Sequence, residues 1–182
     1  ISDENGRLKA LTLPELRSIG ESLQLGLTGP IERRLGHLKT TTDWPYSPLG
    51  TVNLPLLESI GVDLSVRGVA SLPALSLPML TTVGRSLHIA ENELLSWISI
   101  PRLASLGESV DTIEDEADTE SIFALQRNPF LAALSFRRLE RINGPVTILD
   151  NWSLPRCITD AFRDRLSLDS SDDRGRLDCS CW

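Results

Sequence analysis

A short motif recurs along the chain, and a run of alternating apolar and polar residues comes after it. The motif is apolar-Pro-x-Leu-x-x-apolar-Gly, and it is found at 13–20, 54–61, 77–84 and 100–107, with a degenerate copy at 136–143 that has lost the proline and the glycine. An alternating run such as Ser-Leu-His-Ile at 86–89 comes after the glycine. Alternation with a period of two indicates a strand with one buried face. Each copy therefore predicts a bend at the glycine, where a positive φ or a close backbone contact excludes a side chain, and then a short strand.

Equivalent positions in these copies recur every 23 residues. Leu64, Leu87 and Val110 keep this spacing, and we expect them to lie above one another. Two longer steps, of 41 residues from Gly20 to Gly61 and of 36 from Gly107 to Asn143, exceed the period by 18 and 13. They predict insertions within residues 26–48 and within residues 110–122.

A single repeat cannot bury its own apolar face, but stacked repeats share one interior. We therefore predict an all-β solenoid of about six leucine-rich coils, stacked roughly 4.8 Å apart. The coils occupy residues 8–157, and the chain of 1–182 forms a single domain. Aromatic residues are only 5% of the chain, so we expect aliphatic layers in the core and no aromatic clusters.

Residues 154–166 predict a short helix with Pro155 in its first turn. Ile158, Ala161, Phe162 and Leu166 fall on one stripe of this helix. A solenoid needs a cover on its last coil, where backbone groups and apolar side chains would otherwise be exposed. Residues 155–182 are therefore predicted to form a helical cap and a cysteine-containing tail.

The three cysteines, Cys157, Cys179 and Cys181, all lie in this C-terminal region. Cys157 falls in the core column of Leu75, Ile98 and Leu134. We predict a disulfide from Cys157 to Cys179 or Cys181 that clamps the tail over the cap. Three free thiols are the alternative. A metal site is disfavoured because no histidine lies near enough in the sequence to complete a ligand set.

Asn92, Asn128 and Asn151 each come three residues after an inward-facing Ile or Leu of a predicted strand. A turn residue or an internal asparagine ladder is the favoured interpretation, and a ligand contact is the alternative. Asn151-Trp152-Ser153 is also a glycosylation triplet, which applies only in a secreted eukaryotic protein.

The unit Leu-Pro-x-Leu-x-x-Val-Gly-x-Ser-Leu-x-Ile-x-x-Asn at 77–92 resembles the receptor L-domain family. The resemblance covers residues 8–157 and is closest to the fungal cell-wall, sporulation-type members and to secreted bacterial members. It implies a right-handed parallel β-helix located outside the cell or on its surface. The chain has one glycine where many members have two, and no ligand-contacting motif of the receptor members can be matched.

The formal net charge is −7, and no stretch is basic beyond Arg33-Arg34, which argues against a nucleic-acid partner. No apolar run is long enough to span a membrane. His37 and His88 are the only histidines, and His88 is expected on the solvent side of its strand. No catalytic motif is found, so we expect neither an enzyme nor a cofactor. A carbohydrate-active β-helix enzyme is the weaker alternative.

The remaining functions are a surface module that binds a protein or a glycan and a structural component of a cell wall or surface. Candidate ligand-binding residues are Trp44 and Tyr46 in the first insertion, and His88 and Trp97 among the repeats. The second insertion has six carboxylates at 111–120, which indicate a solvated loop, or less readily a site for calcium or a basic partner. Because a coil begins at Leu8, we also expect an upstream segment or a neighbouring chain to cover the first coil.

Overall fold

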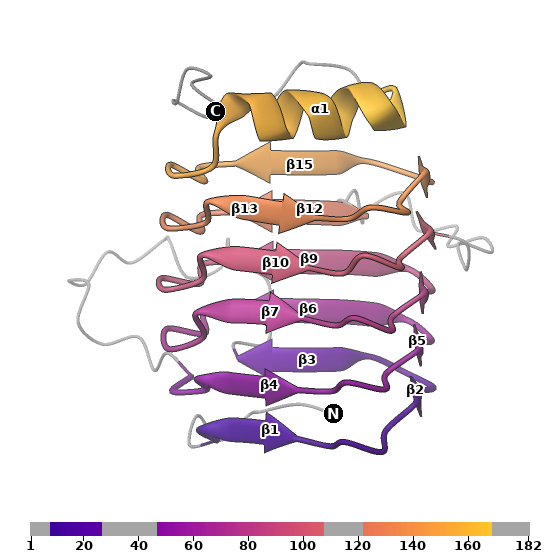
Figure 1. The fold of residues 1–182 in the computed structure, drawn as a ribbon, viewed down its shortest axis with the longest axis vertical. Coiled ribbons are helices and arrows are strands. Elements are labelled where there is room, and N and C mark those ends of the chain that lie inside the picture. Colours follow the sequence, from indigo (N-terminus) through magenta and orange to yellow (C-terminus); the bar gives the residue numbers. More distant parts are fainter. Residues whose placement is uncertain (1–7, 27–46, 108–121, 169–182) are drawn as a thin grey trace, which may run out of the picture.

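The computed structural model describes residues 8–26, 47–107 and 122–168, which form parallel β-sheets and one short helix (Figure 1). Within this part of the chain, each repeat contributes three short strands. These are β1 (Ala10–Thr12), β2 (Ser18–Ile19) and β3 (Leu23–Gly26); β4 (Thr51–Asn53), β5 (Ser59–Ile60) and β6 (Asp63–Arg67); β7 (Ala74–Ser76), β8 (Thr82–Val83) and β9 (Ser86–Ala90); β10 (Trp97–Ser99), β11 (Ser105–Leu106) and β12 (Phe123–Gln126); β13 (Ala133–Ser135), β14 (Arg141–Ile142) and β15 (Val146–Leu149). The helix α1 (Arg156–Leu166) follows β15.

The three strands of a repeat belong to three different sheets. The two longest sheets have the orders β15-β12-β9-β6-β3 and β14-β11-β8-β5-β2, and the third side is formed by β13-β10-β7 and by β1-β4. All strand pairs are parallel, and equivalent strands of successive repeats lie side by side (Figure 1). The chain thus visits the sheets in the same order in each repeat.

The predicted register is confirmed at Leu64 and Leu87, which are direct partners in β6 and β9. The next residue of this column was predicted wrongly. Val110 lies outside the described residues, and Phe123 of β12 takes the place beside Leu87. Both residues are apolar and both fit a 23-residue column, so the spacing alone could not show that the chain enters the sheet only after the second insertion.

Leucines fill the interior in columns. One column comprises Leu49, Leu72, Leu95, Leu131 and Leu154, none of which is more than 2% exposed. Leu154 continues the column beyond the fifth set of strands, so residues 151–154 begin a sixth repeat before the chain turns into α1. The described residues therefore contain five complete sets of strands, compared with the expected six coils, because the chain turns into α1 before the sixth repeat forms a strand.

Helix α1 packs across the last repeat, as its spacing of apolar residues predicted (Figure 1). Pro155 directly precedes the helix, Phe162 is 5% exposed, and Ile158 and Leu166 pack partly against the core. Ala161 is exposed. The expectation of a purely aliphatic core was wrong here, because Phe162 forms an aromatic cluster with Phe123 and Phe136.

Both predicted reasons for the recurring glycine are found, at different copies. A Cβ on Gly61 would meet the backbone oxygen of Gly20 at 2.0 Å, so this position requires close backbone contact. Gly107 instead has a φ of +78°, which disfavours any residue with a side chain.

The first repeat is less well covered than the others. Leu11, Leu13 and Leu16 are only partly buried, and Leu8 is 38% exposed. Strands β1, β2 and β3 stand at the ends of their sheets. Residues 1–7 lie outside the described residues, so the expectation of a covering segment or partner stays a prediction.

Candidate binding surface

The three asparagines form an internal ladder that joins successive repeats. The Oδ1 atom of Asn128 accepts hydrogen bonds from the backbone N–H of Asn92 at 3.2 Å and from its Nδ2 at 3.0 Å. The Oδ1 atom of Asn151 accepts the same pair of bonds from Asn128, at 3.1 and 3.0 Å. Asn92 in turn accepts the backbone N–H of Val69 at 3.0 Å. All three side chains are at most 3% exposed, which confirms the ladder interpretation.

A backbone feature accompanies each asparagine. Glu91, Arg127 and Asp150 directly precede the ladder residues and have φ values of 59°, 52° and 57°. This left-handed conformation costs a residue with a side chain about 1 kcal/mol. The ladder bonds offset this cost and fix the turns in which the chain leaves the sheet of β9, β12 and β15.

In these turns, and in one case at the start of the next strand, large apolar side chains project into solvent. We call this set the apolar ridge. It comprises Leu94 (53% exposed), Trp97 (43%), Phe130 (59%) and Trp152 (49%). The turns from β9 to β10, from β12 to β13 and from β15 to α1 lie one above another along one edge of the molecule (Figure 1). The ridge therefore extends over three successive repeats.

The neighbours of Trp97 leave its indole ring accessible. Trp97 is paired in the sheet with Ala74 on one side and Ala133 on the other. Alanine has no atoms beyond Cβ with which to cover an adjacent ring. The structure thus places Trp97, a candidate from the sequence, on the apolar ridge.

The other candidate binding residues are not on this surface. His88 was expected to face solvent but is only 7% exposed, and its Nδ1 lies 2.8 Å from Nη2 of Arg67. The strand alternation gives the face of the sheet on which His88 lies but does not show whether that face is covered. Trp44 and Tyr46 lie outside the described residues.

The structure argues against glycosylation at Asn151. Its Nδ2 donates to the carbonyl oxygens of Leu125 at 2.8 Å and Leu149 at 3.1 Å, and the side chain is 3% exposed. A glycan would replace one of these amide hydrogens in a buried position. The folded repeat therefore has no room for a glycan at this nitrogen.

Cys157 lies in α1 and not in a strand, and it is partly buried. It takes part in a disulfide bond. Cys179 and Cys181 lie outside the described residues, so the pairing of Cys157 with one of them stays a prediction.

A separate polar cluster surrounds Asp63, at the start of β6. The carboxylate accepts hydrogen bonds from Arg85 Nε at 2.9 Å and Nη2 at 2.5 Å and from Ser86 Oγ at 2.6 Å. Burial alone would raise the pKa of Asp63, but the bonds from Arg85 and Ser86 outweigh it and lower the pKa below 3.8. These hydrogen bonds join Asp63 to Arg85 and Ser86 of the next repeat, so the cluster connects two repeats.

Sequence reasoning missed Leu94, Phe130 and Trp152. A signal was present: each of them follows a ladder asparagine by one or two residues. Read alone, an apolar residue in a turn is unremarkable, because single exposed apolar side chains are common. Only the stacking of the three turns brings them together.

In the described segments, no group of three or more His, Cys, Asp or Glu side chains is placed to hold a metal ion. No helix among these residues is long and apolar enough to cross a membrane. Comparison of the chain with models of known families, with curated proteins and with solved structures finds no match.

Proposed function

We propose that this chain is a non-catalytic binding module, extracellular or on the cell surface, that recognises a protein through the apolar ridge. One observation carries the proposal. Of the five exposed large hydrophobic side chains in the described residues, four lie on this ridge, and only Leu8 lies elsewhere. Large apolar side chains that are exposed along one edge of a domain favour an interaction site there.

The residue types of the ridge suit protein recognition. Tryptophan and phenylalanine bury a large area on binding and lose few rotamers, and they are enriched among the residues that dominate binding energies. The ladder beneath the ridge holds its turns in one conformation before binding. A preorganised surface loses less entropy when a partner docks.

The proposal includes a finer architecture, a right-handed parallel β-helix of the receptor L-domain type. It is supported by the 23-residue repeat and by the parallel pairing of equivalent strands. Connections between parallel strands are almost always right-handed. The disulfide at Cys157 supports an extracellular location, since disulfides persist mainly in oxidising compartments.

A structural role in a cell wall or surface layer is the second candidate, and the first repeat favours it. Strands β1, β2 and β3 end their sheets among the described residues, and Leu11, Leu13 and Leu16 are only partly covered. A neighbouring chain docked there would extend the sheets and cover these leucines.

The test is a screen of the purified chain against arrays of extracellular proteins and of glycans. For a protein partner, the Phe130→Ala/Trp152→Ala double variant should bind at least thirtyfold more weakly, because two anchors are lost. The matched control Leu8→Ala removes an exposed apolar side chain from the other end of the stack and should bind normally. Equal binding by the double variant and the wild type contradicts the proposal. Binding on the glycan array alone moves the assignment to a carbohydrate ligand.

A further inference from the structure

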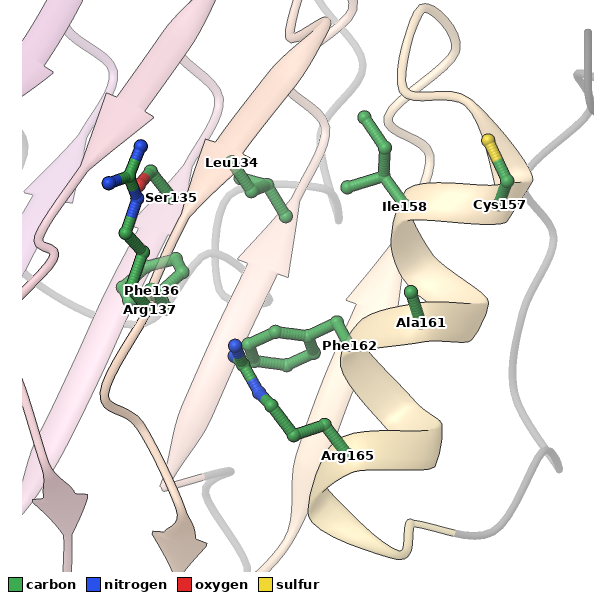
Figure 2. A pocket seen from close by; sticks show the side chains of 9 residues that line it. All are labelled: Leu134, Ser135, Phe136, Arg137, Cys157, Ile158, Ala161, Phe162 and Arg165. Atoms are coloured by element: carbon green, nitrogen blue, oxygen red, sulfur yellow. The ribbon is translucent and has the colours of Figure 1, made fainter. Parts of the chain in front are cut away.

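A pocket of about 590 Å³ lies between α1 and the end of the β13 sheet, and none of the ridge residues lines it. We call it the helix-edge pocket. Its apolar lining comes from Leu134 and Phe136 on one wall and from Ile158 and Phe162 of α1 on the other (Figure 2). The pocket can therefore accept an apolar side chain between the helix and the sheet.

One wall of this pocket is the edge of a β-sheet. Strand β13 pairs with β10 and with no other strand of the described residues. The backbone N–H of Ala133 bonds to Ser96 O, and Ser135 O accepts the N–H of Ile100, so both residues use their backbone groups toward β10. In a parallel pair the residue between them points its N–H and C=O to the opposite side. The backbone groups of Leu134 therefore face the pocket side.

Two arginines add charge to the pocket. Arg137 and Arg165 both line it, and Arg165 extends from α1 over the ring of Phe162, with its Cζ 5.8 Å from the ring centroid (Figure 2). Neither guanidinium forms an ion pair with any described residue. Although the whole chain has a formal charge of −7, these two arginines place positive charge at the pocket, and this charge favours an acidic ligand.

We propose that the helix-edge pocket binds an extended acidic peptide segment of a partner protein. The segment adds a strand beside β13 and pairs with the free N–H and C=O of Leu134. It places an apolar side chain between Leu134 and Phe162 and a carboxylate on Arg165 and Arg137. When a strand is added to a sheet edge, backbone hydrogen bonds supply the affinity and alternate side chains supply the specificity. The pocket offers both kinds of contact.

The probe is the synthetic peptide acetyl-Thr-Val-Glu-Leu-Glu-Val-Thr-amide, titrated into the intact chain by calorimetry at low and physiological salt. We expect saturable binding that weakens with salt, and about tenfold weaker binding to Arg165→Gln, since a hydrogen bond to a charged group is lost. The matched control is Arg102→Gln, an exposed arginine on the link between β10 and β11, which should not change binding. The same peptide with lysine in place of glutamate should not bind.

Two N-methylated peptides test the strand pairing. Methyl groups are placed on one or the other set of alternate backbone nitrogens, because only one set points at the sheet edge. One peptide should lose binding at least tenfold and the other should retain it. Equal binding of both, or unchanged binding to Arg165→Gln, overturns the proposal. Binding that is seen only with Cys157→Ser also overturns it, because a segment of this chain tethered at Cys157 would then be the occupant.

This inference does not depend on the ridge. Phe130→Ala/Trp152→Ala should bind the peptide like the wild type. If the peptide binds while no ridge partner is found, only the proposed function fails. If a ridge partner is found while the peptide does not bind, only the inference on the helix-edge pocket fails.

Discussion

The rings of Phe162 and Phe123 lie 5.3 Å apart, measured between centroids. Phe162 belongs to α1, whereas Phe123 belongs to β12, which pairs with β15 directly below the helix. Through Phe162, the helix therefore contacts not only the last set of strands but also the set beneath it, to which β12 belongs. Phe136 completes the cluster, at 5.9 Å from Phe162.

Phe162→Ala should lower the free energy of unfolding by about 3 kcal/mol, because it removes a buried ring and leaves a cavity. Urea denaturation followed by circular dichroism measures this loss. Phe130→Ala is the control, since Phe130 is 59% exposed and its removal should change stability by less than about 0.5 kcal/mol. Equal effects of the two variants would show that α1 is not anchored through its phenylalanine.

Asn128→Leu should destabilise the chain by about 3 kcal/mol. The substitution keeps the branched shape and the number of side-chain heavy atoms but leaves the backbone N–H and the Nδ2 of Asn92 without their buried acceptor. Chemical denaturation measures the change, and Asn53→Ala, at an exposed position of β4, is the control. A stability equal to that of the wild type would contradict a structural role for the ladder.

Gly61→Ala and Gly20→Ala form a matched pair in the same motif. The new Cβ at position 61 would meet Gly20 O at 2.0 Å, whereas a Cβ at position 20 meets no atom within 4 Å. We expect a loss of about 2 kcal/mol or more for the first and almost no change for the second. Thermal melting distinguishes them, and a large loss for Gly20→Ala would be inconsistent with the backbone geometry.

The free energy of unfolding should fall at acid pH, partly because the carboxylate of Asp63 becomes protonated. Burial acts to raise its pKa, but the hydrogen bonds from Arg85 and Ser86 lower it below 3.8 in the folded chain. A carboxyl group whose pKa is lowered by folding contributes stability above its unfolded value, and this contribution is lost as the pH falls from 3.8 through the folded value. Urea denaturation between pH 7 and pH 3 should show a flatter acid limb for Asp63→Asn. Arg102→Gln should keep the wild-type profile, and an unchanged profile for Asp63→Asn would refute this linkage.

Periodicity in the sequence was sufficient for the strand that follows each glycine, for the register of Leu64 with Leu87, and for the covering helix, but it did not identify the other two strands of each repeat. It was not sufficient for Phe123, because an apolar residue such as Val110 satisfies the same spacing. It also missed the phenylalanine cluster, since Phe123, Phe136 and Phe162 are distant in the sequence and meet only when the repeats stack. Aromatic content alone gave no hint of this.

The candidate surface was predicted only at Trp97. Alternation assigns His88 to the outer face of a strand but carries no information on what covers that face, and the side chain is buried. The exposed residues Phe130 and Trp152 lie in turns, where periodicity makes no prediction. Their position follows from the ladder asparagines, which place each turn above the one before.

Radical footprinting of the complex with a partner from the array screen tests the central claim most directly. Hydroxyl radicals oxidise exposed indole and phenyl rings, and mass spectrometry compares the free and the bound chain residue by residue. We predict strong protection of Trp97, Phe130 and Trp152 in the complex and none at Leu8. Unchanged oxidation of these three rings in a saturated complex would contradict the ridge as the binding surface.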